Sequence, residues 1–175
     1  ILDTGVFADN RYYDVFVEYA KEDVNDILIQ ISMVNRGPET QTLHLLPTLW
    51  FRNTWAWDNG HRDKPTMTVA ETTDHYSVIE AHHPELGTYH FYCDRTPPLL
   101  FTDNETNHER LYGETYGTTN RGGYAKDGIN NYVVEGQEDA VNPAQTGTKV
   151  SPHYQLTLEP GMTKVIRLRL SDQAS

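Results

Sequence analysis

The chain has 175 residues, of which 37% are hydrophobic, 22% charged and 11% aromatic, a composition typical of a folded globular domain and not of a disordered segment. Fourteen Lys and Arg residues stand against 25 Asp and Glu residues, and the resulting net charge of -11 argues against nucleic acids and anionic membranes as partners. The sequence also contains no run of the roughly 18–20 apolar residues that a membrane span needs.

Alternating apolar residues predict a series of strands in the first half of the chain. From Ile27 to Met33 every second residue is Ile or Met, which is the period of a strand with one buried face, and we expect this strand to run from Asp26 to Asn35. A second alternating run covers Thr42–Arg52, where Pro47 predicts a bulge or an edge position. Further strands are predicted over Tyr12–Ala20, Thr66–Ala70, His75–Ala81 and Thr88–Cys93.

The segment from about residue 103 to residue 150 has a different composition, rich in Gly, Asn, Thr and Tyr. It predicts a long irregular segment with one or two short helices. Asp103 or Asn104 is suited to cap a helix that ends before Gly113, and Asp127 is suited to open another that ends before Gly136. Long irregular segments in compact domains commonly bind a ligand or pack on a neighbouring domain.

The end of the chain predicts a β-hairpin. Apolar residues alternate over Tyr154–Leu158 and again over Val165–Leu170, and the turn residues Glu159–Met162 separate the two runs. Because no strand alternates with a long amphipathic helix, the sequence predicts an all-β fold. We expect an antiparallel, supersandwich-like β-sandwich in one domain over residues 1–175.

A single cysteine, Cys93, excludes an internal disulfide framework and fits a reducing compartment, so we expect a cytoplasmic protein with Cys93 as a small core residue. The first residue is Ile1 and not Met, which predicts that the chain is part of a longer polypeptide. Its sheets are then expected to expose an edge and to allow self-association.

The densest aromatic cluster lies between Leu49 and His61, at the end of a predicted strand. Indole rings stack on sugars, but Trp side chains also anchor domain interfaces and cores, so all three roles remain open for this cluster. Polar residues of the cluster and of the long irregular segment complete a candidate substrate or domain-interface site. Its members are Trp50, Arg52, Asn53, Trp55, Trp57, Asp58, Asn104, Glu105 and Asn107.

Eight histidines raise the alternative of a cupin-like metalloenzyme that uses His82 or His83 together with His90. Adjacent residues of a strand point to opposite faces, however, so His82 and His83 do not form the converging pair that such a site needs. We therefore expect no metal and no cofactor. The acidic residues of the irregular segment, such as Glu105 and Asp127, have no spacing that pairs them for acid–base catalysis.

Several stretches of the sequence resemble bacterial proteins related to mannosyl-oligosaccharide glucosidase and mannosylglycerate hydrolase, of the glycoside hydrolase family sixty-three type. The resemblance covers nearly the whole chain. It rests on Ile1–Phe7, Arg11–Ala20, His44–Trp55, Phe101–Asn107, Tyr132–Val134, Val141–Ala144 and Thr146–Lys149.

The resemblance implies that this chain is the non-catalytic β-sandwich portion of an inverting α-glycosidase whose catalytic carboxylates lie in an (α/α)6 barrel of the same polypeptide. It assigns no catalytic residue to this chain. The expected role is packing on that barrel and rimming its substrate cleft. A stand-alone carbohydrate-binding module that takes oligosaccharide is the alternative.

Overall fold

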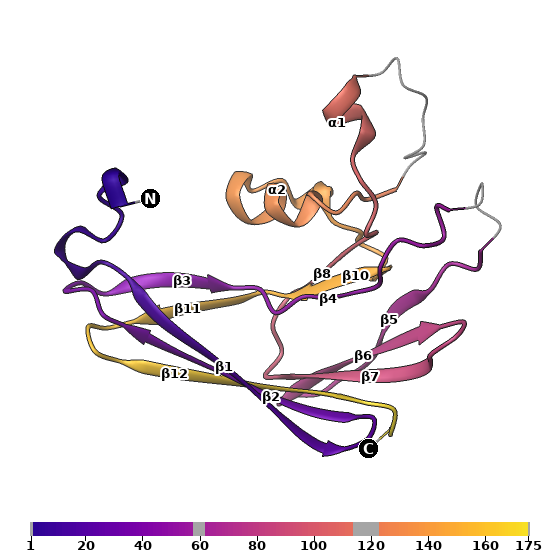
Figure 1. Ribbon diagram of the computed structural model, residues 1–175, viewed down its shortest axis with the longest axis horizontal. Helices are drawn as coiled ribbons and strands as arrows, with labels where there is room; N and C mark the ends of the chain where they lie inside the picture. Colours follow the sequence, from indigo (N-terminus) through magenta and orange to yellow (C-terminus); the bar gives the residue numbers. More distant parts are fainter. Residues whose placement is uncertain (1, 58–61, 114–122, 175) are drawn as a thin grey trace.

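The structure is a computed structural model that describes residues 2–57, 62–113 and 123–174 (Figure 1). Antiparallel strands dominate it, and within the described residues they form one large sheet and two small ones. The seven-stranded sheet contains, in spatial order, β1 (Tyr13–Asp23), β2 (Asp26–Asn35), β12 (Thr163–Ser171), β7 (Gly87–Asp94), β6 (Tyr76–His83), β5 (Thr66–Thr72) and β9 (Thr146–Gly147). The small sheets are β4 (Leu49–Trp50), β10 (Lys149–Pro152) and β8 (Leu99–Thr102), and β11 (Tyr154–Leu158) with β3 (Gln41–Leu45).

The hydrophobic core lies between the large sheet and the small ones. Met33, Ile79 and Ile166 contribute to it from the large sheet, while Phe101 and Leu158 face them from the small sheets. All five side chains are fully buried. The predicted all-β, antiparallel fold is therefore confirmed.

Local patterning located most of the strands. β2 has the predicted bounds. Of the four alternating residues that were expected to be buried, Ile31 and Met33 are buried, Ile29 is partly buried and Ile27 is exposed. The predicted strand over Thr42–Arg52 is interrupted at Pro47, and the interruption is larger than a bulge. The part before it, β3, pairs with β11 in one small sheet, and the part after it, β4, pairs with β10 in the other. Because proline has no N–H to donate, the chain changes sheets at this point.

The predicted terminal hairpin is wrong. β11 pairs with β3 and β12 pairs with β2 and β7, so the two last strands belong to different sheets. The turn at Glu159–Met162 carries the chain across the core, and Leu158 and Ile166 are both buried there. Two consecutive strands with apolar faces can bury those faces by facing each other, and sequence patterning does not distinguish this arrangement from a hairpin.

The irregular segment carries two short helices, as predicted, α1 (His108–Tyr112) and α2 (Gly128–Glu135). Gly113 and Gly136 end them, and Gly136 has the left-handed conformation of a helix C-cap. The cap predicted at Asp103 or Asn104 is wrong, because the side chain of Asn107 accepts the hydrogen bond from the N–H of Arg110. The described residues also form 3-10 helices at Leu2–Thr4, Ala8–Asn10 and Glu138–Ala140.

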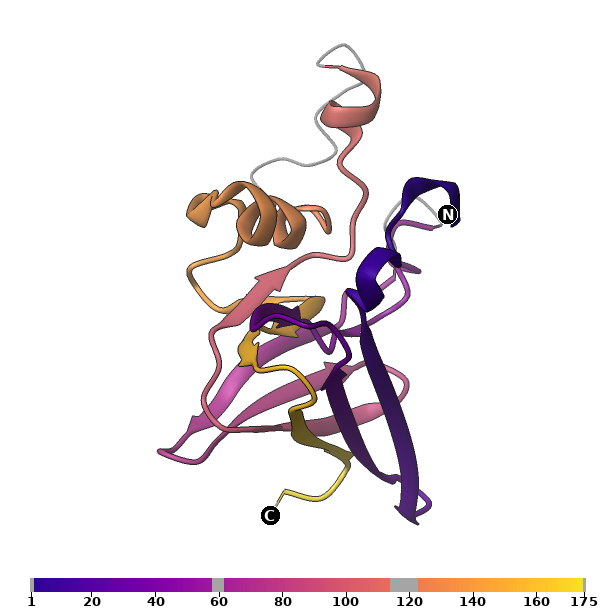
Figure 2. The ribbon, with the colours of Figure 1, turned by 90° about the vertical axis from the view of Figure 1, so that its left-hand side faces the viewer.

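Both helices lie on the side of β4, β10 and β8 that faces away from the large sheet, as Figures 1 and 2 show. The segment that follows β4 lies on the same side. In the part of the chain that the structure describes, we find no helix with the length and apolarity of a membrane span.

Candidate functional site

Trp55 forms the fixed centre of the predicted site. It is only 6% exposed, and its Nε1 donates a hydrogen bond of 2.9 Å to Oε1 of Glu105. The ammonium group of Lys64 binds the same oxygen at 3.2 Å and Oδ2 of Asp103 at 2.8 Å. Burial alone lowers the pKa of Lys64, but the hydrogen bonds and negative charges of Asp103 and Glu105 outweigh it and raise that pKa. Trp55 therefore takes the core role among the three that the sequence left open.

Asn104 and Asn53 stabilise the chain around Trp55. The side chain of Asn104 donates a hydrogen bond of 2.9 Å to the carbonyl oxygen of Phe51. The backbone N–H of Asn104 donates one of 2.8 Å to the hydroxyl of Thr148. Oδ1 of Asn53 accepts a hydrogen bond of 3.1 Å from the N–H of Ala56. The contacts of Asn104, which follows β8, connect it to Phe51 after β4 and to Thr148 before β10. The contact of Asn53 stabilises the turn after β4. Both amides therefore have structural roles.

Asn107 links the two helices. In addition to capping α1, its amide donates to Oδ2 of Asp127 at 3.2 Å. Arg110 of α1 donates to the same oxygen at 3.0 Å and to Oδ1 of Asn131 in α2 at 3.1 Å. Asp127 occupies the N-cap position of α2, as predicted. Its side chain, however, accepts hydrogen bonds from the side chains of Asn107 and Arg110 and not from a backbone N–H of α2.

Trp50, Arg52 and Trp57 are the exposed members of the predicted site, and we call them the aromatic surface. Trp50 is 54% exposed and Trp57 is 47% exposed. The guanidinium carbon of Arg52 lies 5.2 Å from the centroid of the Trp57 ring, and that of Arg62 lies 5.7 Å from it. The Trp57 ring is thus engaged by two cations.

The structure therefore separates the predicted site residues into two sets. One set is a hydrogen-bonded support, and the aromatic surface lies outside it. The support consists of Asn53, Trp55, Asn104, Glu105 and Asn107. Asp58 lies outside the described residues. A further apolar side chain that sequence reasoning missed, Leu111 of α1, is 61% exposed.

The histidines of β6 and β7 do not converge. His82 lies beside the hydroxyl of Thr88, whereas the ring of His83 accepts hydrogen bonds from the N–H groups of Glu85 and Leu86. His90 lies 3.9 Å from Glu80 on the neighbouring strand. Across residues 2–57, 62–113 and 123–174, no three His, Cys, Asp or Glu side chains are placed to hold a metal ion.

A different histidine pair, His44 with His153, was not predicted. Nδ1 of His44 lies 2.7 Å from Nε2 of His153, and the rings stack with centroids 5.0 Å apart. Burial, followed by the charge of His44, lowers the pKa of His153. Since 109 positions separate the two residues, only strand pairing between β3 and β11 brings them together, and no local pattern could have indicated it.

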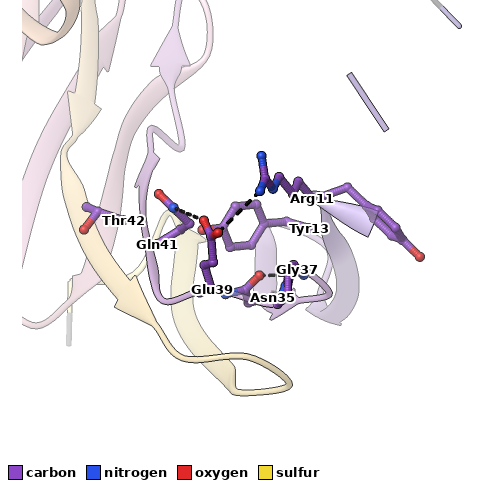
Figure 3. Close-up of a pocket in the computed structure, with 9 residues that line it drawn as sticks. Arg11, Tyr13, Asn35, Gly37, Glu39, Gln41 and Thr42 are labelled. Carbon is purple, nitrogen blue, oxygen red and sulfur yellow. Dashed lines mark hydrogen bonds and ion pairs between the residues drawn. The ribbon is translucent and has the colours of Figure 1, made fainter. Parts of the chain in front are cut away.

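A hollow of about 250 Å³ lies where the start of β1 meets the loop between β2 and β3 (Figure 3). Arg11 and Gln41 converge there on Glu39, at 3.4 Å and 3.5 Å from its carboxylate oxygens. The hydroxyl oxygen of Tyr13, which also lines the hollow, is buried and has no hydrogen-bond partner among the described residues. The sequence contains no motif that pointed to this hollow.

Comparison with models of known protein families gave no match. A protein of Saccharomyces cerevisiae, Uncharacterized protein YMR196W, is 32% identical to this chain over an alignment of 190 residues. The match covers 94% of this chain but only 17% of the yeast protein, so the chain spans a small part of the relative's length.

Proposed function

We propose that this chain is a non-catalytic β-sandwich domain of a glucosidase-like glycoside hydrolase, and that its aromatic surface packs on a helical catalytic barrel of the same polypeptide. The observation that carries the proposal is that Trp50 and Trp57 are exposed, while Trp55, which lies between them in the sequence, is buried and hydrogen-bonded to Glu105. Large aromatic and Arg side chains that are exposed together are typical of interfaces.

The family resemblance of the sequence supports the identity of the partner, and the length of the yeast relative beyond the matched part is consistent with it. The catalytic carboxylates are assigned to the barrel. In the described part of this chain, Glu105 and Asp127 both bind cations and polar hydrogens of their own domain. We also propose a cytoplasmic location, on the ground of the single buried cysteine.

The first test is the coding sequence on both sides of this chain, where we expect a region of long amphipathic helices. The second test is glycosidase activity. The purified 175-residue chain should release no glucose or mannose from α-glycosides, whereas the longer polypeptide should do so. Measurable hydrolysis by the short chain would contradict a non-catalytic role.

Packing on the barrel can be measured by acrylamide quenching of tryptophan fluorescence, because the chain contains only three Trp residues. The pair of substitutions Trp50→Phe and Trp55→Phe leaves Trp57 as the single reporter, and the pair Trp55→Phe and Trp57→Phe leaves Trp50. We expect quenching of both reporters to fall several-fold in the longer polypeptide, after subtraction of the signal of its other Trp residues, which is measured in a variant that lacks Trp50, Trp55 and Trp57. The variant that keeps only Trp55 is the matched control, since this buried ring should be shielded in both proteins.

A carbohydrate-binding module is the second candidate function, and the exposure of the tryptophan rings indicates which residue would bind the sugar. Trp57 is already engaged by Arg52 and Arg62, so a sugar that stacks on it must compete with these cations. Trp50 is the more exposed ring and is therefore the better platform. Under this alternative, oligosaccharide should change the fluorescence of the protein, and Trp50→Ala should abolish the change while Trp57→Ala should not.

A further inference from the structure

β1 is one of the two outer strands of the seven-stranded sheet. It pairs with β2 on one side, and among the described residues it has no neighbouring strand on the other (Figure 2). Every residue of β1 from Val15 onward is exposed, and Tyr19 reaches 70% exposure. A long edge strand with exposed apolar residues presents unpaired N–H and C=O groups to another strand.

Val15, Val17 and Tyr19 of β1 lie on the face of the sheet that carries the core, whereas Phe16 lies on the opposite face. The register with β2 places Val15 beside Met33 and Val17 beside Ile31, and both residues of β2 are buried core members. Val15 and Val17 are nevertheless exposed. The β1–β2 hairpin projects beyond the two small sheets that cover the core elsewhere (Figure 1).

We propose that two copies of this chain associate through β1, as antiparallel neighbours in one continuous sheet. The two-fold axis is perpendicular to the sheet and passes midway between Val17 and its copy. This symmetry keeps the core faces of both copies on the same side. It also places Val17 opposite its own copy and Val15 opposite Tyr19 of the second copy, so that apolar side chains cover one another.

Charge and overlap together select this register over its neighbours. An axis two residues earlier would pair only residues 13–17 of β1 with the second copy, whereas the axis at Val17 pairs residues 13–21. With the axis at Val17, no charged residue of β1 lies opposite a like charge. An axis one residue earlier would place Asp14 opposite Glu18, and an axis one residue later would place Glu18 opposite its own copy. An axis two residues later would place Asp23 opposite Val15. A two-fold axis that lies between two successive residues of β1 is excluded, because it would place a side chain on the core face opposite a side chain on the solvent face.

The association is tested by multi-angle light scattering and sedimentation equilibrium of the 175-residue chain over micromolar concentrations. We expect a reversible dimer. Val17→Lys places two ammonium groups opposite each other, and charged edge residues are known to block strand pairing, so the dissociation constant should rise by about tenfold or more. Val24→Lys is the matched control: it adds the same charge at a residue that is 74% exposed in the turn after β1, beyond the paired positions, and should leave the dimer intact.

The register is tested by cross-linking. Residues directly opposite in antiparallel strands have Cα atoms roughly 4.5–5.5 Å apart, within the range that a disulfide spans. Under mild oxidation, Val17→Cys should therefore form a covalent dimer, whereas Val15→Cys, which does not meet its own copy, should stay largely uncross-linked. Cys93 is buried and does not compete.

A monomer at all concentrations would overturn the proposal, and so would a dimer that Val17→Lys leaves unchanged. Preferential cross-linking of Val15→Cys would overturn the register. The proposal does not depend on the aromatic surface: Trp50→Ala and Trp57→Ala should leave the dimer unchanged whether or not that surface packs on a barrel. If the same variants weaken the dimer, the association uses the aromatic surface and not β1.

Discussion

Trp55 and Trp57 are two positions apart, but their surroundings differ completely. The Trp55 ring is buried and its N–H binds a carboxylate, whereas the Trp57 ring lies at the surface beside two guanidinium groups. In this segment, the hydrogen-bond partner and not the residue type decides which tryptophan supports the fold.

Trp55→Phe is expected to lower the free energy of unfolding by about 1.5–3 kcal/mol, because it removes a hydrogen bond to a charged group and leaves Glu105 with one donor fewer. Urea denaturation followed by circular dichroism measures this change. Trp57→Phe should alter stability by less than about 0.5 kcal/mol. Equal losses in the two variants would show that the hydrogen bond with Glu105 is not what distinguishes them.

Asp26 gives a pH-dependent prediction. It is buried, and its two oxygens accept hydrogen bonds of 2.6, 2.9 and 3.1 Å from Arg169, which lower the pKa of Asp26. A carboxyl group whose pKa is lower in the folded state stabilises the fold above its unfolded pKa of about 3.9, and this contribution disappears as the pH falls through the folded pKa. Asp26→Asn should therefore show a smaller loss of urea resistance than the wild type between pH 7 and about pH 3. Asp74→Asn, at an exposed turn, should behave like the wild type.

At the level of elements, close approach of backbones decides where the short strand β9 lies. A Cβ at Gly147 would overlap the carbonyl oxygen of Thr102, the last residue of β8. The absence of a side chain at this position lets β9 join the large sheet while it passes against the small one. The sequence contained the glycine, but nothing around it indicated that another strand would lie so close.

Gly147→Ala is expected to destabilise the protein by about 2–3 kcal/mol, since the overlap is with backbone and cannot be relieved by a side-chain rotation. Gly136→Ala, at the end of α2, should cost about 1 kcal/mol, because its left-handed conformation is strained for alanine although no atom lies within 4 Å. Thermal denaturation of both variants provides the ranking. A larger loss at Gly136 would contradict the overlap.

At the scale of the whole molecule, Cys93 reports on global unfolding. It is completely buried in β7, in the interior of the seven-stranded sheet, and burial raises the pKa of its thiol. We expect no reaction with a thiol reagent in native buffer, and labelling in urea that follows the main unfolding transition. Rapid labelling of the native protein would mean that this part of the sheet opens independently.

The sequence by itself determined the features that depend on neighbouring residues. Alternation from Ile27 to Met33 located β2, and Gly113 and Gly136 marked the ends of the two helices, because strand periodicity and helix termination are local properties. The candidate site could be predicted as a group of residues, but not the division of that group into a buried support and an exposed surface.

Only the tertiary structure decided which sheet each strand joins and which side chains are covered. β11 and β12 follow each other in sequence but lie in different sheets, and His44 meets His153 across 109 positions. Trp55 is buried, and its N–H donates to Glu105, which is 50 positions away. Strand pairing and burial arise from contacts between distant parts of the chain, so the residues around a given position do not encode them.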